Sequence, residues 1–216
     1  MTRKYPEVQS PLELSLAELP LDGSSAVLWG RLFGAERPLR VEIGVGNSSF
    51  LIEVARSAPQ FNYLGFEYSR KRVLKFLKKV EAAAFTNIRM LRVDAGLVIG
   101  HLFQDDSVDH VYINHPDPWP KRRHARKRFV STENAREIRR LLAPGGGLSL
   151  RTDVPQYALQ MLEVLDGTEG LENLAGKGCF APAPLENHPT PYERKFLGEG
   201  RKIFYMEYIK IQGRSC

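Results

Sequence analysis

A proline-rich loop followed by a basic run carries the side chains best suited to chemistry. Residues 114–120 read Asn-His-Pro-Asp-Pro-Trp-Pro, and residues 121–128 add six cations and no acid. Each proline fixes its own φ and restricts the residue before it, so the loop is stiff and cannot be helical. Asp117 could accept hydrogen bonds from guanine N1–H and its amine together, and Trp119 offers an aromatic face. This combination indicates a site for a nucleobase within a nucleic acid.

Each of these features also has a plainer interpretation. Asp117 could cap a backbone N–H in a structural turn, Trp119 could fill the core, and the basic run could be an ordinary solvated surface. The six charges of the run equal the net charge of +6 of the whole chain, so we interpret the basicity as one local patch, which favours phosphate recognition. Lys121, nearest the loop, is expected to act within the site. The residues expected to hold phosphates are Arg122, Arg123, Arg126, Lys127 and Arg128.

A glycine turn after a short strand indicates a cofactor site. The strand ends near Glu42, and Gly44-Val-Gly46 would let a ligand approach the backbone closely. Glu67 follows at about 20 residues, the spacing of an acid that binds a ribose, and Asp94 could accept from an adenine amino group. The alternatives are a simple turn, a surface carboxylate and a helix cap. A nicotinamide dehydrogenase would share this unit, but the turn has no third glycine.

The hydrophobic pattern predicts alternating strands and helices. Five strand–helix units in succession favour a mostly parallel sheet with helices on both faces. Ligands of such sheets bind beyond the carboxyl ends of the strands, where we expect Glu42, Glu67, Asp94, Asp117 and Asp153 to gather. Asp153 could instead cap its helix. Strands are predicted at 39–43, 61–66, 88–93, 108–114, 148–151 and 202–210, and helices at 50–56, 69–84, 97–103, 132–142 and 155–165.

Length and composition fit one sizeable domain. The 216 residues are 43% apolar and 26% charged, as in ordinary globular proteins. We expect residues 1–36 to form an irregular arm with one short helix near 12–19, and residues 37–216 to form a single domain. Two cysteines indicate neither a disulfide framework nor a metal site, and no signal or membrane segment is evident, so we expect a cytoplasmic protein.

Several motifs together resemble the tRNA (guanine-N7)-methyltransferase family over roughly residues 38–210. The run from Pro116 through Asp-Pro-Trp-Pro-Lys-Arg-Arg to His124 is the most specific. Many members carry two phenylalanines where this chain has Asn114 and His115, and Ser48 stands near the place of a third glycine. The other matching motifs are Glu42-Ile-Gly-Val-Gly, Gly65-Phe-Glu67, Asp94-Ala, Arg126-Lys-Arg, Thr152-Asp153 and Thr190-Pro-Tyr-Glu193.

The resemblance implies a Rossmann-like class I methyltransferase fold with an antiparallel closing strand. It also implies methyl transfer from S-adenosylmethionine to N7 of a guanine in the tRNA variable loop. We expect a monomer or homodimer, with tRNA as partner and without metal or membrane partners. Asp117 would be the catalytic residue. The implied cofactor contacts are Glu42, Gly44, Gly46, Glu67, Asp94 and Asp117. The implied contacts to the guanine are Lys121, Asp153, Thr190, Pro191, Tyr192 and Glu193.

Guanine N7 carries an in-plane lone pair and no proton, so its attack on a sulfonium methyl needs no general base. Catalysis would then consist of in-line positioning and electrostatic stabilisation of the cationic product base. We expect Asp117 and Asp153 to orient the guanine and offset this charge, while Glu67 fixes the cofactor ribose. An inactive RNA-binding protein on the same fold stays an alternative.

Overall fold

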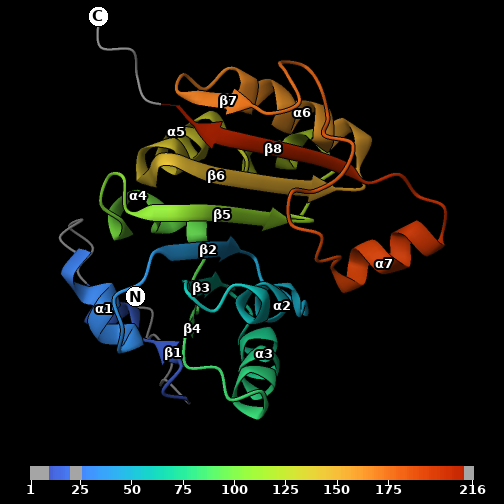
Figure 1. The fold of residues 1–216 in the computed structure, drawn as a ribbon. Helices are drawn as coiled ribbons and strands as arrows, with labels where there is room; N and C mark the ends of the chain where they lie inside the picture. The colour runs from blue at the N-terminus through green and yellow to red at the C-terminus, as the bar shows by residue number, and fades with distance from the viewer. Residues whose placement is uncertain (1–9, 20–25, 212–216) are drawn as a thin grey trace, which may run out of the picture.

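An eight-stranded sheet organises the computed structural model, which describes residues 10–19 and 26–211. Its strands follow the order β1-β4-β3-β2-β5-β6-β8-β7, and every neighbouring pair is parallel except those of β8 with β6 and β7 (Figure 1). This arrangement confirms the mostly parallel sheet with an antiparallel closing strand. The strands are β1 (Glu13–Leu14), β2 (Leu39–Ile43), β3 (Asn62–Phe66), β4 (Ile88–Leu91), β5 (Val108–Asn114), β6 (Leu142–Thr152), β7 (Leu171–Asn173) and β8 (Phe204–Lys210).

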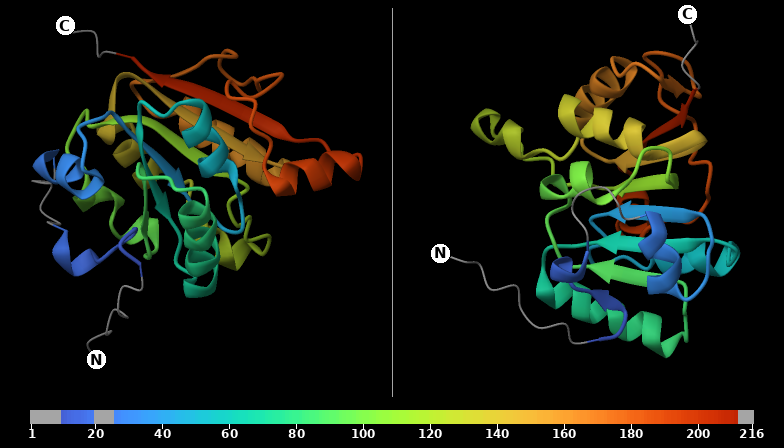
Figure 2. Two further views of the ribbon diagram at one scale, coloured as in Figure 1. Left: turned by 60° about the horizontal axis from the view of Figure 1, so that its bottom comes forward. Right: turned by 90° about the vertical axis from the view of Figure 1, so that its left-hand side faces the viewer.

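Helices cover both faces of the sheet, as the two further views in Figure 2 also show. One apolar cluster joins α2 and α3 to β3 and β4, and a second joins α1, α4, α5 and α6 to the opposite face. No helix in the described part of the chain is long and apolar enough to cross a bilayer. The helices are α1 (Ala26–Phe33), α2 (Phe50–Ser57), α3 (Arg70–Ala82), α4 (Ile99–Leu102), α5 (Thr132–Leu141), α6 (Pro155–Asp166) and α7 (Pro191–Gly198), with 3-10 turns at Leu16–Glu18, Ala95–Leu97 and Arg122–Lys127.

Part of the expected irregular arm is ordered against the domain. Strand β1 pairs in parallel with β4, and the side chains of Trp29 and Phe33 from α1 are buried in the core. The short helix expected near 12–19 is wrong, because a strand and a 3-10 turn occupy these positions. Residues 1–9 and 20–25 of the arm lie outside the described residues. The division into an arm and one domain stays a prediction.

Helix α7 was not among the helices predicted from the sequence, and it follows a stretch rich in glycine and proline. The helix begins with a capping box. The Thr190 hydroxyl accepts from the Glu193 backbone N–H, and the Glu193 carboxylate accepts from the Thr190 N–H. Pro191 takes the first helical turn, where its missing N–H costs nothing. Thr-Pro-Tyr-Glu is therefore a helix-start signature, which the surrounding glycines and prolines concealed.

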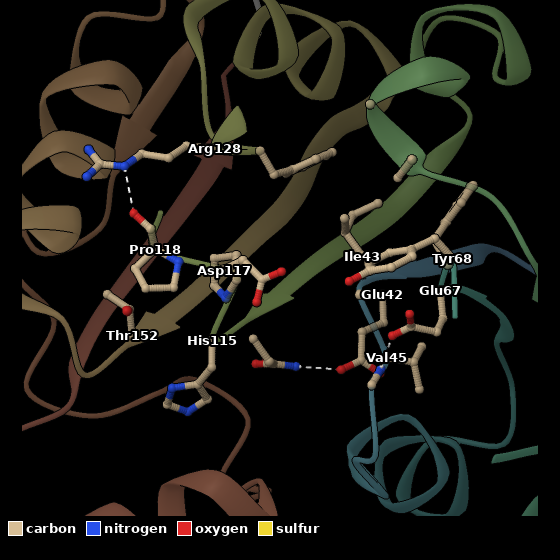
Figure 3. Close-up of a pocket in the computed structure, with 18 of the residues that line it drawn as sticks. Glu42, Ile43, Val45, Glu67, Tyr68, His115, Asp117, Pro118, Arg128 and Thr152 are labelled. Carbon is tan, nitrogen blue, oxygen red and sulfur yellow. Dashed lines mark hydrogen bonds between the residues drawn. The ribbon is translucent and has the colours of Figure 1, made fainter. Parts of the chain in front are cut away.

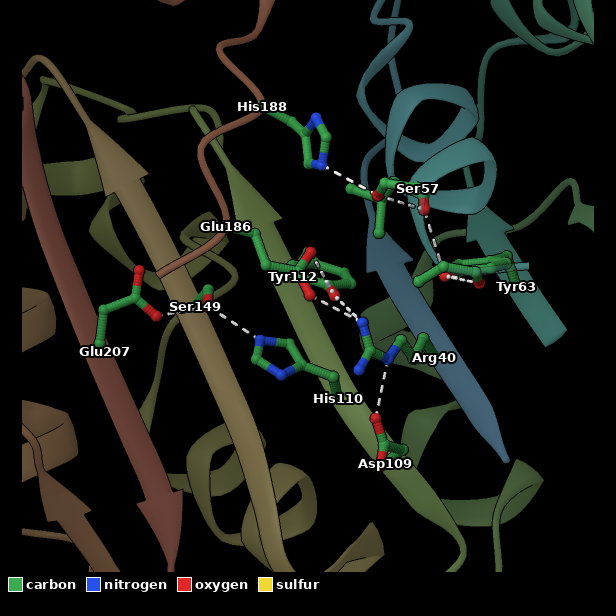
Figure 4. A network of polar contacts seen from close by, with 12 residues as sticks. Arg40, Ser57, Tyr63, Asp109, His110, Tyr112, Ser149, Glu186, His188 and Glu207 are labelled. Atoms are coloured by element: carbon green, nitrogen blue, oxygen red, sulfur yellow. Dashed lines mark hydrogen bonds and ion pairs between the residues drawn. The ribbon is translucent and has the colours of Figure 1, made fainter. Parts of the chain in front are cut away.

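Polar side chains anchor the segment before α7 to the sheet (Figure 4). Arg40 of β2 donates to Glu186 at 2.7 Å and to Asp109 at 2.7 Å, and the Tyr112 hydroxyl donates to the other Glu186 oxygen at 2.9 Å. The Glu207 carboxylate of β8 accepts from the backbone N–H of Leu185 at 3.2 Å. These bonds hold residues 185–186 on the sheet and thereby direct the chain toward the carboxyl ends of the strands, where α7 lies.

Candidate functional site

A cleft of about 1070 Å³ opens at the carboxyl ends of β2 to β6 (Figure 3). It brings together most of the residues singled out in the sequence, and leaves Lys121, Arg123, Pro191 and Glu193 outside its lining. The side chain of Arg122 lies outside the described residues. Predicted site residues that line the cleft are Glu42, Gly44, Gly46, Glu67, Asp94, Asp117, Arg126, Lys127, Arg128, Asp153, Thr190 and Tyr192.

The glycine turn after β2 has room for a ligand. Gly44 and Gly46 have φ values of +77° and +62°, which L side chains rarely adopt. A Cβ added at Gly44 would meet no atom within 4 Å, so the backbone faces open space. The Glu67 carboxylate supports the turn, because it accepts from the Gly46 N–H at 3.0 Å and from the Ser69 N–H at 2.8 Å. The turn and its acid thus form a rigid unit that fits a nucleoside-bearing cofactor.

Glu42 is a fully buried carboxyl group at the floor of the cleft. Its Oε1 accepts from the Asn114 side-chain amide at 2.8 Å, while Oε2 has no hydrogen-bond partner among the described residues. Burial raises the pKa of Glu42 to about 8, against the opposing effects of Asn114 and Arg151. The free protein therefore holds a neutral acid here, with one oxygen available to a ligand.

Asp94 and Asp117 differ in how they are held. The Asp94 carboxylate accepts from the Gly96 N–H at 3.0 Å, so the cap considered from the sequence exists, and the residue still lines the cleft. Asp117 is exposed and makes no hydrogen bond or ion pair within the described chain, and its carboxylate points into the cleft (Figure 3). A turn-capping role for Asp117 is excluded within the described residues, because none of their backbone N–H groups donates to its carboxylate.

Arg128 holds the proline-rich loop in place. Its guanidinium donates to the Pro118 carbonyl at 2.8 Å and lies 5.0 Å from the centre of the Tyr157 ring. Trp119 is half-buried outside the apolar clusters, with Lys127 Nζ 4.7 Å from its ring centre, so it does not fill the core. Arg126 and Lys127 are exposed at the edge of the cleft. Within the basic run, one cation therefore stiffens the loop while others face solvent.

Asp153 joins the cleft to the segment after α7. It does not cap its helix; it forms an ion pair with Arg201, and its other oxygen lies 3.5 Å from His115 Nδ1. His115 has a φ of +47° and a side chain only 8% exposed, and it packs near the rings of Tyr192 and Phe196. Arg201 was not anticipated from the sequence, where it stands in an unpatterned Gly-rich stretch.

Glu193 is buried beneath α7 rather than open to the cleft. It forms an ion pair with Arg151 of β6 at 2.7 Å, and the Tyr205 hydroxyl donates to it at 2.5 Å. Burial alone would raise the pKa of Glu193, but Tyr205, Arg151 and the Thr190 N–H together hold it below its ordinary value. The buried pair thus fixes the start of α7, whose Tyr192 lines the cleft. Arg151 was not identified from the sequence.

The sheet order, the glycine turn and the strand-end acids define a class I methyltransferase fold. Solved structures with the same fold include an aminoglycoside resistance methyltransferase (TM-score 0.59, 16% identity, 89% of this chain and 99% of that chain). Another is a 16S rRNA (adenine(1408)-N(1))-methyltransferase from Catenulisporales acidiphilia, solved with its cosubstrate SAM (TM-score 0.59, 16% identity, 88% and 93%).

Sequence comparison identifies the family within this class. Residues 36–206 match a family described as putative methyltransferase. The tRNA (guanine-N(7)-)-methyltransferase of Geobacter metallireducens is 34% identical over 94% of this chain and 95% of its own length. The tRNA (guanine-N(7)-)-methyltransferase of Alkalilimnicola ehrlichii is 40% identical over 83% of this chain and 76% of its own length. The chain belongs to the tRNA (guanine-N7)-methyltransferase family and is a methyltransferase.

Proposed function

We propose that this protein transfers the methyl group of S-adenosylmethionine to N7 of a guanine in the variable loop of tRNA. The observation that carries the proposal is the unpartnered Asp117 carboxylate, which lies in one cleft with the glycine turn and the Arg126 and Lys127 cations. The names of the relatives support the substrate and the atom. The cleft could accommodate both a cofactor and a flipped base.

The glycine turn and three acids would hold the cofactor, which supplies an electrophilic methyl group on a positively charged sulfur. Gly44 and Gly46 admit it close to the backbone, and Glu67 is placed for its ribose hydroxyls. Asp94 has one carboxylate oxygen free to accept from the adenine amino group of the cofactor, because only the other oxygen accepts from the Gly96 N–H. Glu42 offers its unpartnered Oε2 from the floor of the cleft.

The other side of the cleft would hold the guanine. Its N7 needs no general base, so the protein contributes alignment and charge. Asp117 would accept from the base and offset the positive charge that N7 gains. Asp153 would act beside Asp117 after the guanine replaces Arg201 as the partner of the Asp153 carboxylate. Tyr192 is exposed at the cleft and would contact the guanine, with Thr190, Pro191 and Glu193 as its support.

The basic run would bind the backbone around the extruded nucleotide. Arg123, Arg126 and Lys127 are exposed and suited to phosphates. Arg128 already binds loop carbonyls, so we propose that it acts by keeping the loop rigid. Lys121 and Arg122 precede these residues. Lys121 stays a prediction as a contact to the guanine, and Arg122 stays a prediction as a phosphate contact.

Labelled methyl transfer to unmodified tRNA, followed by cleavage specific for 7-methylguanine, tests the proposal. A label at one cleavable guanine of the variable loop is expected. Bound S-adenosylhomocysteine without any labelled tRNA would instead favour the inactive RNA-binding protein. The variant D117A should lower kcat by about 100-fold or more, the usual cost of a lost electrostatic group. It should change the Kd for tRNA by less than about threefold, because a carboxylate contacts no phosphate and tRNA binding is dominated by cations.

The exposed carboxylate of Glu172 on β7 provides a matched control, and E172A should behave as the wild type. Equal losses in kcat and in tRNA affinity for D117A would contradict the role assigned to Asp117.

A further inference from the structure

Helix α3 carries a second concentration of positive charge, separate from the basic run. Its thirteen residues include six cations and a single acid, Glu81. Acidic residues elsewhere in the chain offset the cations of α3 in the net charge of +6. The interpretation of the basicity as one local patch is therefore wrong. The cations are Arg70, Lys71, Arg72, Lys75, Lys78 and Lys79.

Packing fixes the orientation of this charge. The apolar face of α3, which includes Val73 and Leu77, is buried against α2 and the sheet. The opposite face is therefore held toward solvent, and its outermost cations are exposed. Four cations of α3 are exposed, and within the described ranges none of their side chains forms an ion pair. They are Arg70, Lys71, Lys75 and Lys78, and we call them the α3 basic face.

A helix that is merely solvated usually mixes charges of both signs. Helix α5 does so, since it carries two acids beside three arginines, and Arg140 pairs with Glu137 and with Asp105 at 2.7 Å each. Among the described residues of α3 only Arg72 forms an ion pair, with Glu67, and the four cations of the α3 basic face form none. Burial and the neighbouring charge of Lys75 lower the pKa of Lys79. An anionic ligand would relieve this repulsion.

The helix that carries the α3 basic face reaches the cleft through two of its other cations. Arg72 lines the cleft, with its guanidinium 3.7 Å from the Glu67 carboxylate, and Lys79 Nζ donates to the Asn47 carbonyl of the glycine turn at 3.3 Å. Strand β2 lies between β3, which precedes α3, and β5, which precedes the basic run (Figure 1). Cations therefore flank the glycine turn on both sides, with Arg126 and Lys127 on the far side.

We propose that the α3 basic face is a second contact surface for the phosphate backbone of the RNA substrate. The proposal rests on the proposed function, because it extends the same cleft to a longer stretch of tRNA. Extruding a guanine requires the flanking structure to be held against the cost of unstacking. Exposed cations without acidic partners supply such binding energy through release of counterions from the phosphates.

The test compares two triple variants of equal net charge. K71Q/K75Q/K78Q neutralises three residues of the α3 basic face. R31Q/R136Q/K177Q neutralises three exposed cations elsewhere on the molecule. The Kd for unmodified tRNA is measured between 50 and 300 mM salt for both and for the wild type. Binding of S-adenosylhomocysteine reports that the cleft is intact in each.

For K71Q/K75Q/K78Q the slope of log affinity against log salt should fall in magnitude by about 2 to 3, since each lost phosphate contact removes about 0.7 to 0.9. The control should keep the wild-type slope, and kcat at saturating tRNA should stay within about twofold for both. An unchanged slope, or an equal fall in both variants, would overturn the proposal. A wild type that forms no 7-methylguanine would refute the proposed function instead. The slopes would still decide the role of α3, because binding is measured without turnover.

Discussion

Glu42 should make the stability of the free protein depend on pH in a direction opposite to that of most carboxylates. Its pKa rises from an ordinary value of 4.5 to about 8 on folding, because the group is fully buried. Well below pH 4.5 the group is protonated in both states and has no effect. As the pH rises toward 8, the unfolded chain releases the proton while the folded protein keeps it, so the folded state loses stability.

The size of this effect follows from the linkage between proton binding and folding. Each unit of pKa shift corresponds to about 1.4 kcal/mol, so the free energy of unfolding should fall by about 2.5 kcal/mol between pH 5 and pH 7 from this group alone. The variant E42Q removes the titration, and its side-chain oxygen can still accept from Asn114. Its stability relative to the wild type should therefore improve by about 2 to 3 kcal/mol over the same interval.

Urea unfolding at pH 5, 6, 7 and 8, without cofactor, measures this difference. Taking the difference between E42Q and the wild type cancels all other titrating groups. E163Q, which removes an exposed carboxylate from α6, should follow the wild type. A constant offset between E42Q and the wild type at every pH would refute the reasoning. It would mean that Glu42 is ionised in the folded protein, with Arg151 outweighing the cost of burial.

Two further predictions concern buried polar groups. H115F should raise Tm, by the equivalent of about 1 kcal/mol, because Nε2 of the buried His115 has no hydrogen-bond partner among the described residues and Nδ1 only approaches Asp153 at 3.5 Å. A lower Tm in differential scanning fluorimetry would show that a nitrogen is bonded. E193Q should cost about 3 to 5 kcal/mol at neutral pH, since it leaves Arg151 buried without a counter-charge. The pKa of Glu193 is depressed, so its contribution exists above pH 4.5 and is lost as the pH falls through the folded-state pKa. The destabilisation measured by urea unfolding should therefore shrink in acid, and a constant loss would contradict this.

The parallel sheet could be predicted because its signals are local. Strands β2, β3 and β5 are short apolar runs that end in a turn or an acid, and α3 and α5 show apolar positions at helical spacing. Strand β6 begins at Leu142, six residues before the start predicted at 148, because Pro144 and the three glycines after it are typical of a break between elements. Residues 143–146 pair with neither β5 nor β8, and Gly145 has a φ of +79°, so the glycines form an irregularity within β6 before pairing resumes at Gly147.

Side chains that act through distant partners could not be predicted in this way. Arg151 gains its role from Glu193, forty-two positions away, and Arg201 from Asp153, forty-eight positions away. Arg128 was expected to bind phosphate, and nothing in a run of cations distinguishes the one that turns back to the Pro118 carbonyl. The α3 cations could have been identified in the sequence by counting charges helix by helix, because the net charge of the whole chain does not separate them from the acids that offset them.

The strand-end acids look alike in the sequence, yet the fold gives each a different chemical state. Glu42 is neutral, Glu67 is bonded to two backbone N–H groups, Asp94 caps a turn and Asp153 is paired with Arg201. Of the five, Asp117 alone keeps a carboxylate without any partner in the described chain. A base that becomes cationic when methylated needs an uncompensated negative charge that does not first have to break another contact. This difference, more than its position in a motif, favours Asp117 as the residue that faces the reacting guanine.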